Sequence, residues 1–343
     1  MPLFVPAATL SAAFHTEIVG PLLDGIPHAA ALVGHGSEVL GFDDLTSTDH
    51  SWGPRMHVFV APDAIGPARA RIDAGLPDTF QGWPVRSGSD LFPVTHHVTV
   101  TTLGRWLVEH LGVDARDGLS TLDWLTIPQQ ILLEATAGPV FADPDGGLGA
   151  VRSALATFPP QVRLWLLGCQ WVRIAQEEAF VGRTAQAGDE LGSRVVAARL
   201  VRELMRVAFL LAGTYWPYTK WFGTAFARLP LAGELSPPLE RVLRATCHPD
   251  REAALVDAYG VVACAHNAAG VTSRVDEAVR RFHDRPFRVL GADRFAVACR
   301  AALTDPDLRD LPSIGSVDQV ADSTDVLGRA SRARRLRALY EGS

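Results

Sequence analysis

The stretch Gly34–Arg55, GHGSEVLGFDDLTSTDHSWGPR, carries the pattern that decides the fold. In it a small pair, Gly36-Ser37, is followed after eleven residues by Asp49-His50-Ser51, and an apolar run then covers 56–60. Another apolar run, at 29–33, precedes the glycine-rich segment. Two apolar runs on either side of a turn predict two strands that return beside each other as a hairpin.

This layout is typical of a nucleotidyltransferase active-site hairpin. Nucleotidyl transfer is an in-line attack on a phosphorus atom that carries negative charge, so the enzyme mainly positions groups and supplies positive charge. A glycine turn lets backbone N–H groups approach the phosphates, and a serine hydroxyl adds a hydrogen bond. We therefore expect the nucleotide to bind at Gly36, Ser37 and Arg55.

The expected cofactor is Mg²⁺, which prefers carboxylate ligands. Residues i and i+2 of a strand face the same side, so an acid-x-acid pair can serve one metal cluster. Asp49 supplies the first acid, but Ser51 stands where the second is needed. Asp44, in the preceding loop, is therefore predicted to bind the ion together with Asp49 and Ser51. A third acid normally comes from a later strand, and the candidate strand His96–Thr101 carries no carboxylate.

Length and composition favour a globular protein of two domains. The chain has 343 residues, of which 48% are hydrophobic and 20% charged, so disorder is not expected. The net charge of −6 argues against a protein that coats nucleic acid, because such binding needs a basic face.

The chain is expected to be cytoplasmic. No apolar run is long enough to span a bilayer, the N-terminal segment lacks the features of a secretory signal, and no membrane partner is expected. The four cysteines are isolated from one another, so a zinc site or redox dithiol built on cysteine pairs is not predicted.

The pattern along the chain predicts an α+β protein. Residues 1–150 mix strand and helix patterns and form the expected nucleotidyltransferase-like domain, whereas residues 151–343 read as an all-α, helical substrate-binding domain. Helices are predicted over 103–111, 190–211 and 273–282, among others.

Read together with the long block LWLLGCQWVRIAQEEAFVGRTAQAGDELGSRVVAARLVRELMRVAFLLAGTYWPYTKWFGTAFARL, the hairpin sequence resembles the bacterial family DUF4037. Shorter blocks, such as HNAAGVT at 266–272 and FHDRPFRVL at 282–290, add to this resemblance. The resemblance implies a nucleotidyltransferase-like fold over nearly the whole chain. Many members of that family read DHDWGP or DHDFGP, where this chain reads DHSWGP, with Ser51 in place of the second aspartate.

The second half supplies the remaining predicted site residues. By analogy with antibiotic nucleotidyltransferases, whose helical domain holds the acceptor, Glu177 or Glu178 is the expected catalytic base. Lys220, among the aromatic residues of TYWPYTKW, is expected to meet the triphosphate. Both predictions have a structural alternative. The glutamates can form ion pairs across helix turns, and the aromatic residues can fill a helix–helix junction while Lys220 extends to water.

Three functions remain open at this point. The first is Mg²⁺-dependent transfer of a nucleoside monophosphate from a nucleoside triphosphate to a hydroxyl of a small acceptor molecule. The second is a catalytically degenerate protein that binds a nucleotide as a sensor, because Ser51 replaces the second metal-binding acid. A different reaction in the same cleft, without metal, is a third alternative that no residue specifies.

Overall fold

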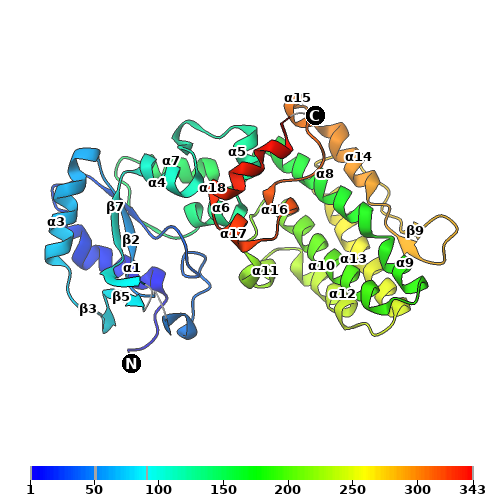
Figure 1. Ribbon diagram of the computed structural model, residues 1–343, viewed down its shortest axis with the longest axis horizontal. Helices are drawn as coiled ribbons and strands as arrows, with labels where there is room; N and C mark the ends of the chain where they lie inside the picture. Colours follow the sequence, from blue (N-terminus) through cyan, green and yellow to red (C-terminus); the bar gives the residue numbers. More distant parts are fainter. Residues whose placement is uncertain (1, 50–51, 90–91, 342–343) are drawn as a thin grey trace. The chain divides into compact units, whose positions relative to one another are not determined.

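The computed structural model describes residues 2–49, 52–89 and 92–341 (Figure 1). These residues form two compact units. The first comprises Met1–Leu119, Gln130–Ala156 and Gly328–Arg334, and the second comprises Ser120–Gln129, Thr157–Leu327 and Arg335–Ser343. Each unit is thus assembled from three chain segments, which differs from the single boundary at residue 150 that the composition suggested.

The first unit is built on a four-stranded mixed sheet of order β7-β2-β1-β8. Its strands are β1 (Ala29–Ala31), β2 (Met56–Phe59), β7 (Val98–Thr101) and β8 (Val140–Ala142). Strand β1 pairs antiparallel with β2, which confirms the predicted hairpin, while β2 and β7 run parallel. The chain is therefore α+β, with the turn between β1 and β2 leaving the middle of the sheet.

Helices and short hairpins complete the first unit. Its other α-helices and strands are α1 (Ala7–Phe14), α2 (Gly20–Leu22), α3 (Ile65–Gly75), β3 (Thr79–Phe80), β4 (Trp83–Pro84), β5 (Arg86–Ser89), β6 (Phe92–His96), α4 (Leu103–Leu111), α6 (Gln129–Thr136), α7 (Gly147–Leu155) and α18 (Ala330–Ala333). Helix α4 has the predicted bounds because both ends are specified locally. Thr102 caps its first turn by accepting from the Arg105 N–H, and Gly112 ends it at a φ of 77°.

The core of the first unit lies between the sheet and its helices. Met56 and Val58 of β2 and Val98 and Val100 of β7 alternate inward and are almost fully buried. Phe14 of α1 packs in the same cluster. Burying such side chains is worth about 1.5–3 kcal/mol each. These contacts bury one face of β2 and β7 in the same cluster as α1.

The second unit is helical apart from one small hairpin. Its elements are α5 (Thr121–Thr126), α8 (Pro160–Glu177), α9 (Phe180–Gln186), α10 (Glu190–Ala212), α11 (Thr219–Phe226), α12 (Ala232–Arg244), α13 (His248–Ala268), β9 (Arg280–Arg281), β10 (Arg288–Val289), α14 (Asp293–Ala302), α15 (Pro306–Asp310), α16 (Val317–Val320) and α17 (Thr324–Leu327). Helix α10 packs against both α8 and α13, and α14 packs on α8 (Figure 1).

A buried ionic network ties α8 to α10. The Glu203 carboxylate, 2% exposed, accepts hydrogen bonds from the guanidinium groups of Arg173 and Arg206 and from the Gln170 amide. Arg206 also donates to the backbone carbonyl of Asp318. Because each buried charge is paired and hydrogen-bonded, the network avoids the cost of a lone buried ion.

The helix predicted over 273–282 is not formed. Instead the Asn267 side chain donates to the carbonyl of Val275 at 2.8 Å and accepts from its N–H at 2.9 Å. These two bonds take the backbone groups that a helix through Val275 would need, and the chain continues extended into β9. An asparagine side chain that mimics a backbone strand competes with helix formation in this way.

No helix in the described part of the chain has the length and apolar character required to cross a bilayer.

The stability of the second unit should depend on pH through His266. Its Nδ1 accepts from Trp171 Nε1 at 3.1 Å, the ring is fully buried, and burial lowers the pKa of His266 to about 4. Since the folded pKa lies below the unfolded value, the neutral ring stabilises the fold above pH ~6.5, and this contribution is lost as the pH falls toward 4.

We therefore expect His266→Gln, which keeps an acceptor but cannot titrate, to flatten the dependence of unfolding free energy on pH between about 6.5 and 4. The slope should fall by at most about 1.4 kcal/mol per pH unit. Urea denaturation at several pH values measures it. A slope equal to that of the native chain would show that His266 does not titrate there.

Candidate functional site

The turn that leaves β1 exposes a row of backbone donors. Gly34 and Gly36 have φ values of 89° and 126°, which favour glycine, and the N–H of Gly34 donates to the carbonyl of Glu134. Within the described residues, the N–H groups of His35, Gly36 and Ser37 have no hydrogen-bond partner. Successive free N–H groups in a glycine turn form a concave site for an anion.

Arg55 supports this turn. Its Nε lies 2.6 Å from the carboxylate of the buried Glu38, its Nη2 donates to the carbonyl of His35, and its backbone N–H donates to the hydroxyl of Ser11. The guanidinium is only 17% exposed. Arg55, predicted as a phosphate ligand, therefore stabilises the turn in this structure through Glu38 and the carbonyl of His35.

Glu38 also explains why residue 36 is glycine. A Cβ placed on Gly36 would lie 2.3 Å from a Glu38 carboxylate oxygen. The ion pair between Glu38 and Arg55 and the backbone of the turn therefore pack directly against each other.

Of the three residues predicted to bind Mg²⁺, the structure describes the side chain of Asp44. Asp44 Oδ1 accepts from the N–H groups of Thr46 and Ser47, which closes a local turn. The side chain of Asp49 and the whole of Ser51 lie outside the described residues.

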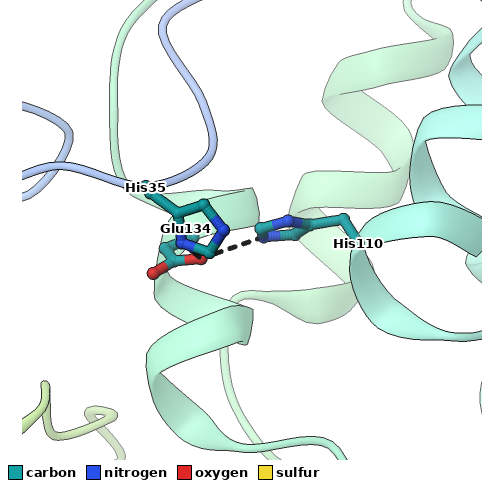
Figure 2. Close-up of side chains that lie close together, drawn as sticks. All are labelled: His35, His110 and Glu134. Carbon is teal, nitrogen blue, oxygen red and sulfur yellow. Dashed lines mark ion pairs between the residues drawn. The ribbon is translucent and has the colours of Figure 1, made fainter. Parts of the chain in front are cut away.

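Three other side chains do converge beside the turn (Figure 2). His35 Nδ1 lies 2.9 Å and His110 Nε2 lies 3.3 Å from the same carboxylate oxygen, Oε2 of Glu134. The three candidate ligand atoms lie within 4.8 Å of one another. They come from the turn after β1, from α4 and from α6, so the fold brings together residues that are far apart in the chain.

The three side chains of this cluster differ in their exposure to solvent. Glu134 is buried, His110 is 10% exposed and the His35 side chain is 72% exposed. The nearby Glu134 carboxylate raises the pKa of His35, whereas burial lowers the pKa of His110. The cluster therefore has a fixed inner part and one ligand that faces solvent.

Aromatic rings hold the inner part. Trp106 stacks on His110 with ring centroids 4.9 Å apart and planes 11° apart, one helical turn away on α4. His57 on β2 contacts Trp106, and burial lowers the pKa of His57 to about 3, so its ring is neutral near pH 7. The Trp106 stack restricts the plane in which the His110 ring can lie.

The site residues predicted in the second half belong to the second unit. Glu177 forms an ion pair with Arg199 at 3.1 Å. Glu178 is buried, and its carboxylate accepts from the N–H groups of Leu290, Gly291 and Ala292. Lys220 is exposed, with its Nζ 4.8 Å from the ring centroid of Trp221. Gly36, Ser37 and Arg55 belong to the first unit.

The sequence interpretation did not include His35, His110 or Glu134 in the site. The only local signal was His35, which directly precedes Gly36-Ser37 in the stretch considered decisive. His110 ends an amphipathic helix, and Glu134 lies in the apolar segment ILLEAT; neither has a metal-site spacing.

Comparison with known proteins supports the resemblance inferred above. Residues 124–222 match the model of the domain of unknown function DUF4037. The predicted resemblance is confirmed over that segment. No curated protein sequence matches the chain significantly. Among solved structures, the chain is similar to a nucleotidyltransferase-like protein from Exiguobacterium sibiricum 255-15, with 12% identity and a TM-score of 0.33 over 81% of this chain and 83% of the other.

Glu178 should contribute to stability more than Glu177. Burial raises the pKa of Glu178 to about 7, and Glu178→Gln replaces one of the two oxygens that accept from the three backbone N–H groups by an NH2 donor. We expect that variant to lower the unfolding free energy by about 1–3 kcal/mol. Glu177→Gln, the matched control, breaks a partly exposed ion pair and should cost less than about 1 kcal/mol. Denaturant unfolding of both variants measures this, and equal losses would contradict it.

Proposed function

We propose that the first unit binds the phosphates of a nucleoside triphosphate at the turn His35–Ser37. The proposed reaction is transfer of the nucleoside monophosphate to a hydroxyl of a small acceptor molecule. The observation that carries this proposal is the row of free N–H groups at the glycine turn. The match of 124–222 to DUF4037 is compatible with it.

The residues of the turn act on the phosphates in defined ways. The N–H groups of Gly36 and Ser37 donate to phosphate oxygens, and the Ser37 hydroxyl adds one donor. Arg55 orders the turn through the carbonyl of His35 and through Glu38, rather than by direct contact. The turn is thereby set before the ligand arrives, which lowers the entropy lost on binding.

Mg²⁺ remains part of this proposal through Asp49, with Asp44 and Ser51 as further ligands. When bound, the ion would neutralise charge on the transferring phosphate. Asp44 already accepts two backbone hydrogen bonds, so its carboxylate would have to share them with the ion. No step through Mg²⁺ follows from the described residues.

A second candidate is a nucleotide sensor without turnover. Asp43 is engaged with the N–H of Ala7 and with Trp52 Nε1, and Asp44 with its own loop. Serine at position 51 removes a further acid. Both aspartates are therefore held by protein donors, and position 51 offers no carboxylate, which favours binding without transfer.

Nucleotide binding is tested by comparing Gly36→Ala with Gly41→Ala. Both glycines have positive φ, but a Cβ at Gly36 meets the Glu38 carboxylate, whereas one at Gly41 meets nothing within 4 Å. We expect Gly36→Ala to weaken binding of a fluorescent ATP analogue at least tenfold, about 1.4 kcal/mol, and Gly41→Ala to leave it nearly unchanged. Thermal melts confirm that both variants fold. Equal affinities, or no binding by the native chain, would refute the proposed site.

Ser51→Asp separates transfer from sensing. In the transferase, restoring the second acid should increase Mg²⁺-dependent release of pyrophosphate from ATP in the presence of candidate acceptors, because a carboxylate binds Mg²⁺ better than a hydroxyl. Asp49→Asn is the matched loss-of-ligand variant and should abolish release. A sensor instead binds ATP in all three proteins and releases no pyrophosphate in any of them.

A further inference from the structure

We propose that His35, His110 and Glu134 bind one transition-metal ion of the zinc class, separate from the Mg²⁺ expected at the aspartates. Two imidazole nitrogens and one carboxylate oxygen already lie within 4.8 Å of one another, from three different segments of the first unit (Figure 2). Imidazole ligands favour Zn²⁺, Co²⁺, Ni²⁺ or Fe²⁺ over Mg²⁺, which prefers an all-oxygen set.

Two atoms of this cluster are buried without a hydrogen bond of proper geometry. They are His110 Nε2 and Glu134 Oε2, which lie 3.3 Å from each other. A proton on His110 Nε2 lies in the ring plane and does not point at Oε2. A metal ion on the lone-pair direction of Nε2 does not need that alignment, because its ligands sit side by side around it.

The spacing suits such an ion. With bonds of about 2.0–2.2 Å, neighbouring ligands of a tetrahedral ion lie about 3.4 Å apart. The distance of 3.3 Å from His110 to Glu134 is close to this value, and the 2.9 Å from His35 to Glu134 is slightly shorter. His35 is largely exposed, so its side chain has room to move toward the ion.

Partners behind the ligands hold them in place. Trp106 stacks on the His110 ring with planes 11° apart, which restricts the plane of the ring. A neutral imidazole with a lone pair on Nε2 is the form that binds metal. Gln130 Nε2 donates to Glu134 Oε1 at 2.8 Å, which turns Oε2 toward the histidines.

The outer side of the cluster is open. His35 faces solvent, so three protein ligands would leave at least one coordination position for water or a substrate oxygen, as in catalytic rather than structural zinc sites. His35 also belongs to the turn with free N–H groups, so the ion would lie next to the proposed phosphate site.

Metal titration without nucleotide tests the site independently of the proposed function. The full chain is stripped with a chelator and titrated with Zn²⁺ by calorimetry and with Co²⁺ by visible absorption. We expect one ion per chain and a Co²⁺ spectrum of low coordination number. Mg²⁺ in excess should not displace it. If no Zn²⁺ or Co²⁺ binds, the metal site is refuted, whatever the outcome with ATP.

Three variants identify the ligands. We expect His110→Ala, Glu134→Gln and His35→Ala to weaken Zn²⁺ binding at least 100-fold. His35 is largely exposed and Glu134→Gln is isosteric, so a loss of fold does not explain both results. His96→Ala is the matched control, because His96 pairs with the carboxylate of Asp73 at 2.8 Å outside the cluster. If all four variants bind Zn²⁺ like the native chain, the ion pair of His35 and Glu134 is structural only.

Discussion

The first unit depends on one buried residue, Glu134, for the position of its exposed turn. The backbone carbonyl of Glu134 accepts from the N–H of Gly34, and its carboxylate faces both His35 and His110. The glutamate therefore joins α6 to the end of β1 and to α4. A carboxylate that is 3% exposed has a high desolvation cost, which is offset only where polar or cationic groups surround it. The histidines and Gln130 provide these groups, and the conformation of the turn follows from them.

Much of the fold could be predicted from the sequence where the signals were local. The hairpin of β1 and β2 followed from two apolar runs around a glycine turn, and helix α4 from its periodicity with Thr102 and Gly112 at its ends. The helix predicted over 273–282 does not form, because the side chain of Asn267 bonds to the backbone of Val275. Asn267 lies outside the segment whose helical pattern was considered. Local propensity is overridden when a side chain elsewhere takes the backbone hydrogen bonds.

The candidate site was less predictable because its residues meet only in three dimensions. His110 and Glu134 are joined to His35 by no motif, since each sits on a different element and the sheet decides where those elements lie. The surroundings of Arg55 were unpredictable for a related reason. The buried Glu38, which forms an ion pair with Arg55, could not be recognised as its partner from spacing alone.

The double role of His35 has a consequence for any chemistry at this turn. Its backbone N–H faces the proposed anion site, while its imidazole belongs to the cluster with Glu134. An ion bound by the imidazole would restrict the turn, so less conformational entropy would remain to be lost when a phosphate binds. The positive charge of the ion would also attract the phosphate. Both effects would strengthen phosphate binding. Thermodynamic reciprocity then requires that the phosphate strengthens metal binding by the same factor.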